Sequence, residues 1–363
     1  MLFFSALVPL PTLGNASVPA MDMPVLDVFG DYGSVLHYLN LQKGVFFMGL
    51  KTVVLNSERM NYDGKLDLSV LSSQVKEYAS TEPDQILERV QGMDVVVTKE
   101  MPVCGDIIAR FPDSVQLICE AGTGYNNIDI EAARARGIAV CNIPAYSTER
   151  VAHTAIMMIL NLSSSMQIQQ AMLARGDRSN FTKCMQVSHV EVNGKILGVI
   201  GAGNIGREVI KVAQALGMKV LAYARTPRPD EDNLKFVSFE ELLKQSDYIS
   251  LHCPLTPQTR HMINKETIAM MKPTAYIINT SRGALIDEPA LIEALQEGRI
   301  AGAGLDVQET EPPVQDNPLY DMPNIILTPH MGWKGLETRQ RLVSILAANI
   351  QAFDEGRPQN VVS

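Results

Sequence analysis

Residues 196–206 read Ile-Leu-Gly-Val-Ile-Gly-Ala-Gly-Asn-Ile-Gly, and this segment is the strongest indication of the fold. Its first five residues are typical of a strand that is buried on both faces of a parallel sheet. Three glycines follow at the spacing G-x-G-x-x-G, which allows a tight turn and a close approach of the backbone to a pyrophosphate. The helix expected next would offer its free N–H groups to the phosphates. The stretch therefore predicts a dinucleotide site, with a purely structural glycine-rich turn as the alternative, and its residues are Gly201, Gly203, Asn204, Ile205 and Gly206.

Strands and helices alternate on both sides of this motif. Upstream, the expected strands are Lys51–Leu55, Val95–Thr98, Val115–Glu120 and Ile138–Asn142. Downstream, they are Lys219–Tyr223, Tyr248–His252, Ala275–Asn279, Gly302–Val307 and Ile325–Thr328. A long helix that begins near Thr148 and continues to Gly176 is expected to join the two series. The alternation predicts parallel sheets covered by helices. At roughly 150 residues per domain, 363 residues suit two domains, with three as the alternative.

The composition excludes several classes of protein. Lys and Arg number 31 and Asp and Glu number 40, so the net charge is −9, and no basic run marks a nucleic-acid partner. Five dispersed cysteines without a C-x-x-C pair argue against a disulfide framework or a zinc site. No apolar run approaches the roughly 18–20 residues that span a bilayer. We expect a cytoplasmic protein without a nucleic-acid, membrane or metal partner.

Residues 1–47 differ from the rest of the chain. They begin with an apolar run and then scatter four prolines, without the period of a helix or a strand. The first lysine is Lys43, which is too late for the positive start of a secretory signal. We predict a disordered extension or a misplaced start codon, and a targeting segment is the alternative.

Polar residues follow three of the expected strands. Arg282 lies in Thr280-Ser-Arg-Gly283, and guanidinium suits bidentate capture of a carboxylate. His330 follows the last strand, and Glu311 precedes two prolines in the loop before that strand. A carboxylate beside an imidazole holds its tautomer and raises its pKa, as a general acid near neutrality requires. Ligands bind at the carboxyl ends of parallel strands, so we expect these groups to share a site.

Four motifs in this order resemble the D-2-hydroxyacid dehydrogenase family. They are the glycine motif, Asn279-Thr-Ser-Arg282-Gly283, Gly304-Leu-Asp306-Val with Glu311-Pro312, and Pro329-His330. The resemblance extends from about Lys51 to Val362 and implies an α/β fold. Two Rossmann-like, doubly wound parallel-sheet domains would enclose the active site in the cleft between them. The substrate domain would be residues 48–148 plus 333–363, and the dinucleotide-binding domain residues 149–332.

The resemblance also implies the catalytic roles. Arg282 would bind the carboxylate and carbonyl oxygen of the substrate, His330 would be the acid/base, and Glu311 would be its partner. The N–H groups of Gly122, Thr123 and Gly124 would hold the substrate carboxylate as a small anion nest. Further cofactor contacts would come from Arg225, Thr226, Pro254, Thr280 and Asp306, the last on the nicotinamide side.

Further segments look like the glycerate dehydrogenase/hydroxypyruvate reductase branch of this family. They are Gly124–Asp129, Asn142–Glu149 and the Trp333 that follows His330. The expected reaction transfers a hydride between NAD(P)H and a small 2-oxo acid, giving the D-2-hydroxy acid. Lys99-Glu100 replaces a more usual Asn-Lys beside the substrate pocket, and we expect Lys99 to bind the substrate. A homodimer formed through the cofactor domains is also implied.

The position after Lys219–Tyr223 bears on the choice of cofactor. NAD-preferring Rossmann units carry an acid there, roughly 20 residues after the glycines, which binds the ribose 2′-hydroxyl. Here Ala224 occupies that position, followed by Arg225, Thr226 and Arg228. Alanine removes the repulsion of a 2′-phosphate and guanidinium groups pair with one. NADP(H) is therefore favoured, and use of NAD(H) is the alternative.

Other functions stay open at this stage. On the same scaffold, a 3-phosphoglycerate dehydrogenase or a D-lactate-type dehydrogenase would differ in the substrate pocket. A nucleotide-sensing corepressor of the C-terminal-binding protein type would keep the same three catalytic residues without relying on catalysis.

Overall fold

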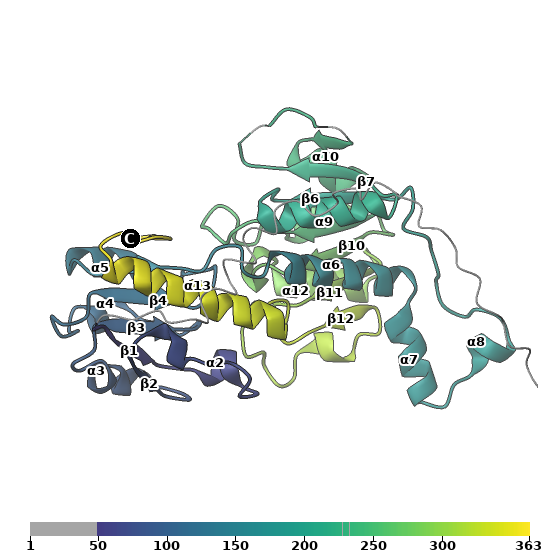
Figure 1. The fold of residues 1–363 in the computed structure, drawn as a ribbon. Helices are drawn as coiled ribbons and strands as arrows, with labels where there is room; N and C mark the ends of the chain where they lie inside the picture. Colours follow the sequence, from purple (N-terminus) through teal and green to yellow (C-terminus); the bar gives the residue numbers. More distant parts are fainter. Residues whose placement is uncertain (1–48, 227, 232) are drawn as a thin grey trace, which may run out of the picture. The chain divides into compact units, whose positions relative to one another are not determined.

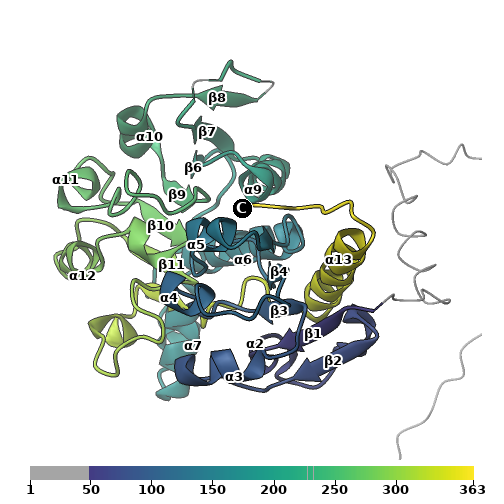
Figure 2. The ribbon, with the colours of Figure 1, turned by 90° about the vertical axis from the view of Figure 1, so that its left-hand side faces the viewer.

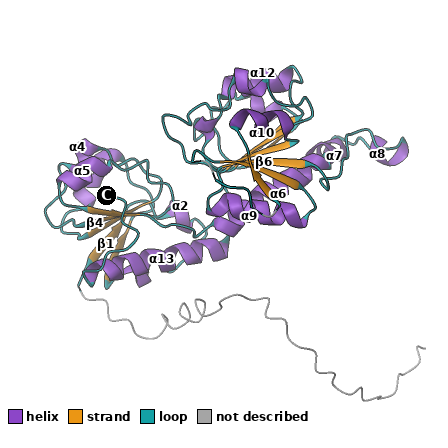
Figure 3. Cartoon of the chain, turned by 90° about the horizontal axis from the view of Figure 1, so that it is seen from above, coloured by secondary structure: helices purple, strands orange, loops and turns teal. Residues whose placement is uncertain are grey.

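The computed structural model describes residues 49–226, 228–231 and 233–363 (Figure 1). The expectations for residues 1–47 lie outside this part of the chain. The described strands form two sheets, and every strand pair within them is parallel. Figure 3 shows both sheets with helices packed on them. The predicted α/β class with two doubly wound parallel sheets is therefore confirmed.

The first sheet has five strands in the order β2-β1-β3-β4-β5. These are β1 (Lys51–Val54), β2 (Gln74–Glu77), β3 (Val95–Thr98), β4 (Leu117–Glu120) and β5 (Ala139–Cys141). Alternate residues of its strands enter two different cores, one on each face. One face is covered by α2 (Glu58–Asn61) and α13 (Leu336–Asp354). The other face is covered by α3 (Ile86–Arg89), α4 (Gly105–Ile108) and α5 (Ile130–Ala135).

The second sheet has seven strands in the order β12-β11-β10-β9-β6-β7-β8. These are β6 (Ile196–Ile200), β7 (Lys219–Tyr223), β8 (Leu234–Phe236), β9 (Tyr248–Leu251), β10 (Tyr276–Asn279), β11 (Gly302–Leu305) and β12 (Ile325–Leu327). The chain proceeds outward from β6 in one direction and from β9 in the other. The neighbouring pair β6 and β9 therefore marks the point at which strand order reverses, where ligands bind in such sheets.

Helices pack on both faces of the second sheet (Figure 2). One face carries α10 (Phe239–Gln245), α11 (Lys265–Ile268) and α12 (Glu288–Gln296). The other carries α6 (Thr148–Ser163) and α9 (Asn204–Ala215). Of the described helices, even the longest, α13, lacks an apolar stretch that could cross a bilayer.

The long helix expected from Thr148 to Gly176 is interrupted. It ends at Ser163, and α7 (Met166–Ala174) begins after Ser165, whose φ of 47° is left-handed. Ser165 also donates its hydroxyl to the carbonyl of Ser188 at 2.7 Å. Serine side chains compete with the helical backbone for hydrogen bonds, so a run of three serines is a physical reason for the break. After it, α7 and α8 (Ser179–Thr182) extend away from the seven-stranded sheet (Figure 1).

Candidate active site

The loops after three neighbouring strands bring the predicted catalytic residues together. Arg282 follows β10, Asp306 follows β11 and His330 follows β12. The parallel register of these strands places their carboxyl ends at one edge of the sheet. Glu311 comes from the connection between β11 and β12. Together with residues of the first sheet, this edge borders a cavity of about 800 Å³.

His330 and Glu311 form a hydrogen-bonded pair in this cavity. Nδ1 of His330 lies 2.8 Å from Oε2 of Glu311. Burial raises the pKa of Glu311, but its hydrogen bond to His330 and the charge of the imidazolium outweigh burial, so this pKa lies below its ordinary value. Among the described residues, Nε2 of His330 has no hydrogen-bond partner. The carboxylate thus fixes one ring nitrogen and leaves the other available to a ligand.

Asp306 holds the loop that carries His330. Its buried carboxylate accepts hydrogen bonds from the hydroxyl of Thr328 at 2.6 Å and from the N–H groups of Met331 and Gly332 at 2.8 Å each. Its carbonyl accepts the N–H of His330 at 2.8 Å. These bonds support the left-handed backbone of His330, whose φ is 48°. Asp306 is therefore a positioning residue for the imidazole.

Arg282 lies against the loop after β4. A Cβ atom added to Gly124 would be 1.8 Å from Nη2 of Arg282, so the guanidinium occupies the space that a side chain would need. Nη1 donates to the carbonyl of Ser281 at 2.8 Å, and Asn279 donates to the carbonyl of Arg282 at 2.9 Å. Strand β10 thus aims the guanidinium at the first sheet.

The loop after β4 has the form of an anion site. In the described part of the chain, the N–H groups of Gly122, Thr123 and Gly124 have no acceptor. Residues that follow β5 fix this loop. Asn142 donates to the carbonyl of Thr123 at 2.7 Å, and the hydroxyl of Thr123 donates to the carbonyl of Ile143 at 2.9 Å. Successive free N–H groups beside a guanidinium favour a carboxylate.

Lys99 lies behind the cavity wall, and only 2% of its side chain is exposed. Its ammonium pairs with Glu100 and lies 4.1 Å from the centre of the Trp333 ring. A Cβ atom on Gly122 would be 3.2 Å from Nζ of Lys99. The ammonium of Lys99 thus contacts Glu100 and Trp333 of the cavity wall, and its contact with the substrate stays a prediction.

The cofactor end of the site is built around the glycine motif. A Cβ atom on Gly206 would be 2.1 Å from the carbonyl oxygen of Gly201, so the helix–strand turn needs glycine there. A Cβ atom added to Gly203 would have no other atom within 4 Å. Helix α9 begins at Asn204, which Ile205 follows, and no side chain caps its N-terminus. The open space and the uncapped helix N-terminus fit a pyrophosphate.

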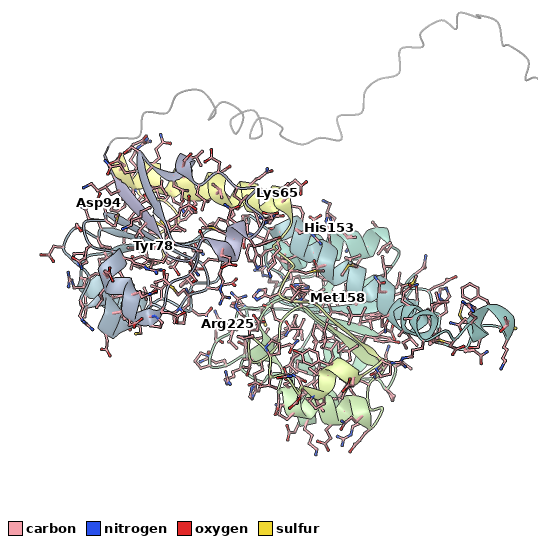
Figure 4. The ribbon with its side chains drawn as sticks, turned by 90° about the horizontal axis from the view of Figure 1, so that it is seen from below. Lys65, Tyr78, Asp94, His153, Met158 and Arg225 are labelled. Carbon is pink, nitrogen blue, oxygen red and sulfur yellow. The ribbon has the colours of Figure 1, made fainter. Side chains whose placement is uncertain are left out.

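The other predicted cofactor residues lie at the same edge of the sheet. Thr280 follows β10, and its buried hydroxyl has no partner among the described residues. Pro254 follows β9, and its carbonyl accepts the hydroxyl of Thr259 at 2.8 Å. Arg225 and Thr226 follow β7 and are both exposed. Arg225 is labelled in Figure 4. Arg225 makes no ion pair with another described residue.

Comparison with known proteins gives the family. The family model "D-isomer specific 2-hydroxyacid dehydrogenase, NAD binding domain" matches residues 156–332. A hydroxypyruvate reductase of Blautia hydrogenotrophica is 41% identical over 287 residues, which cover 78% of this chain and 89% of that protein. The chain belongs to the D-isomer-specific 2-hydroxyacid dehydrogenases.

Two further relatives agree with this assignment. A glycerate dehydrogenase of Methylorubrum extorquens is 41% identical over 292 residues, covering 79% of this chain and 91% of that one. The crystal structure of a glyoxylate reductase from Paecilomyes thermophila superimposes with a TM-score of 0.76 at 32% identity, covering 87% and 98% of the two chains. This D-2-hydroxyacid dehydrogenase is thus an oxidoreductase of the glycerate dehydrogenase/hydroxypyruvate reductase branch, with a nicotinamide cofactor.

Sequence reasoning missed two residues of this dehydrogenase's site. Glu120 ends β4 fully buried, and burial raises its pKa to about 7 despite the charge of Lys99. Its carboxylate accepts the N–H of Glu100 and the amide of Asn127, each at 2.9 Å. Asn56 holds the backbone of Lys99 through bonds of 2.6 and 2.9 Å. An acid at the end of the otherwise apolar strand Leu117–Glu120 was the available signal.

Proposed function

We propose that this dehydrogenase reduces hydroxypyruvate to D-glycerate and glyoxylate to glycolate, with His330 as the acid/base. The observation that carries the proposal is the pairing of His330 with Glu311 at 2.8 Å. The same edge of the sheet carries Arg282, which lies against the loop with the free N–H groups. Residues 48–148 plus 333–363 would carry the substrate, and residues 149–332 the cofactor.

Each residue would act on a different part of the substrate. The N–H groups of Gly122, Thr123 and Gly124 would bind the carboxylate, and Arg282 would bridge the carboxylate and the oxo group. Protonated His330 would give its Nε2 proton to the oxo oxygen while Arg282 stabilises the charge that develops there. Glu311 would hold the ring in place through its contact with Nδ1.

The nicotinamide cofactor supplies the hydride when it is bound. The open space at Gly203, the uncapped start of α9 and the unpartnered hydroxyl of Thr280 support its binding along this edge. Asp306 would act beside the nicotinamide by keeping the His330 loop in place.

We infer a preference for NADPH over NADH. Ala224 leaves the end of β7 without an acid, and Arg225 is exposed beside it, so a 2′-phosphate would meet a cation and no carboxylate. The relevant measure is kcat/KM for each cofactor. Arg225→Ala should lower the ratio of NADPH to NADH, and a wild-type ratio below one would contradict the preference.

We further infer a cytoplasmic homodimer. The segment from α6 to residue 190 exposes large apolar side chains, and Phe181 is 76% exposed. These side chains are Leu160, Met166, Leu173, Phe181, Met185 and Val190. Exposed apolar side chains of this size suit a protein partner, and a second copy of the chain is the expected one. Light scattering at micromolar concentration tests it, since a monomer would contradict it.

A substrate panel tests the proposed reaction. Hydroxypyruvate, glyoxylate, pyruvate and 3-phosphohydroxypyruvate are each mixed with NADPH or NADH, and the loss of reduced cofactor is followed by absorbance. The product from hydroxypyruvate is then resolved by chiral chromatography. D-glycerate is the expected product, and L-glycerate or no turnover with any of the four acids would contradict the proposal. Preference for pyruvate or for the phosphorylated acid would favour the D-lactate or 3-phosphoglycerate alternatives.

A further inference from the structure

The cavity wall near His330 carries a carboxylate that the proposed reaction does not use. Glu100 lines the same cavity as His330 and Glu311, and 31% of its side chain is exposed. Burial opposes its ionisation, but attraction to Lys99, His330 and Arg282 outweighs burial and brings the pKa of Glu100 to about 2. A bound substrate therefore meets a fixed negative charge here.

The position of Glu100 is held by its neighbours. Its backbone has a left-handed φ of 55°, which only surrounding contacts sustain in a glutamate. Asn56 fixes the preceding residue, Lys99, through two hydrogen bonds, and the buried Glu120 accepts the N–H of Glu100. A carboxylate held in this way cannot swing aside at low cost to admit a second anion.

The nearest cation is already neutralised. The ammonium of Lys99 is paired with Glu100, packed on Trp333 and attracted to Glu120. With 2% of its side chain exposed, it is not presented to the cavity. A phosphate on the substrate would therefore approach Glu100 without receiving the charge of Lys99.

The other residues that line the cavity do not offset the negative charge of Glu100. Its described acids, which are Glu58, Glu82, Glu100, Asp306 and Glu311, outnumber its lysines and arginines, which are Arg59 and Lys334. The lining also includes His330, whose imidazole is paired with Glu311. The ammonium of Lys334 is turned to the carbonyl of Pro329 at 3.0 Å. Among the described lysines and arginines of the lining, only Arg59 therefore has a charged group that makes no hydrogen bond or ion pair with another described residue.

We propose that Glu100 is a specificity-determining residue that restricts this enzyme to 2-oxo acids without a second negative charge. The inference rests on the proposed function and narrows its substrate class. A neutral hydroxymethyl group, as in hydroxypyruvate, is accepted because it can donate a hydrogen bond to the carboxylate. A phosphorylated or carboxylated substituent at the same place is repelled.

The test compares hydroxypyruvate with 3-phosphohydroxypyruvate by kcat/KM in four forms of the enzyme. Wild type should prefer hydroxypyruvate by about 100-fold or more, because like charges in a partly desolvated site repel strongly. Glu100→Gln should narrow the preference by about 10- to 100-fold, chiefly through faster use of the phosphorylated acid. Glu100→Asp keeps the charge and should keep most of the preference. Glu58→Gln removes a charge elsewhere in the lining and should change it less than about 3-fold.

A second measurement does not depend on the folding of the variants. In wild type, 3-phospho-D-glycerate should inhibit hydroxypyruvate reduction at least about 10-fold more weakly than D-glycerate. The role of Glu100 would be overturned if 3-phospho-D-glycerate inhibited wild type as strongly as D-glycerate or more strongly. It would also be overturned if a folded Glu100→Gln enzyme kept the wild-type preference for hydroxypyruvate. Neither result would contradict the proposed reductase activity. If wild type reduced neither acid, the proposed function itself would fall, and the specificity role with it.

Discussion

Gly124→Ala tests whether the two sheets meet through Arg282 to form the substrate site. The new Cβ atom would lie 1.8 Å from Nη2 and 3.0 Å from Cζ of Arg282. An ordinary contact of about 3.4 Å requires the guanidinium to retreat by about 1.6 Å. The clash is with the far end of a flexible side chain, so the fold should survive while the guanidinium moves away from the oxo group.

The expected loss is about 100-fold in kcat/KM for the 2-oxo acid, since a displacement near 1 Å costs that much where geometry governs the reaction. The KM for NADPH should stay within about 2-fold, because the cofactor loop lies on another strand. Thermal melting should change by no more than a few degrees.

Gly335→Ala is the matched control for Gly124→Ala. A Cβ atom there would lie 3.3 Å from the hydroxyl of Thr338, a tight contact that a small shift of that side chain relieves, so kcat/KM should be nearly unchanged. Near-full activity of Gly124→Ala on every 2-oxo acid tested would refute the assigned position of Arg282. If circular dichroism showed that Gly124→Ala is unfolded, the claim that the guanidinium can move aside would be refuted.

Two further variants separate stability from positioning. Burial raises the pKa of Glu120 to about 7, so the stability linked to its neutral form is present below about pH 4.5 and is lost as pH rises through about 7. Between pH 5 and pH 8, the free energy of unfolding of wild type, measured in urea, should therefore fall by up to about 3 kcal/mol more than that of Glu120→Gln. The same dependence of this free energy on pH in both proteins would contradict the raised pKa. Asp306→Asn replaces an acceptor of the Thr328, Met331 and Gly332 hydrogen bonds with a donor, so kcat should fall about 10- to 100-fold with little change in NADPH affinity. Loss of NADPH binding with kcat retained, by fluorescence titration and steady-state rates, would make Asp306 a cofactor ligand instead.

Much of the fold was predictable because its strands are buried on both faces. Ile196–Ile200 and Val95–Thr98 are continuous apolar runs, and such runs are a direct signature of parallel sheets. Strands β2 and β8 lie at sheet edges and went unpredicted. Residues of β2 are mostly exposed and polar, and β8 has only three residues, so neither has a pattern that hydrophobic burial would impose.

The catalytic residues were accessible from sequence for a related reason. Arg282, Asp306 and His330 each follow an apolar strand of the same sheet, so topology alone brings them to one edge. The surroundings of Glu100 were not accessible in this way. Lys99 follows β3, Glu120 ends the adjacent strand β4 of the other sheet, and the ammonium of Lys99 packs on Trp333, which is distant in sequence. Such long-range packing leaves no periodic trace in either segment.

Replacement of His330 is the most direct test of the acid/base assignment. Asparagine tolerates the left-handed φ of 48° at this position, so His330→Asn removes the proton carrier without straining the loop. Turnover of hydroxypyruvate with NADPH should fall by about 10² to 10⁴, the usual contribution of general acid–base catalysis, while fluorescence titration shows unchanged NADPH binding. Near-wild-type turnover by a folded His330→Asn enzyme would contradict the central claim that the imidazole paired with Glu311 delivers the proton.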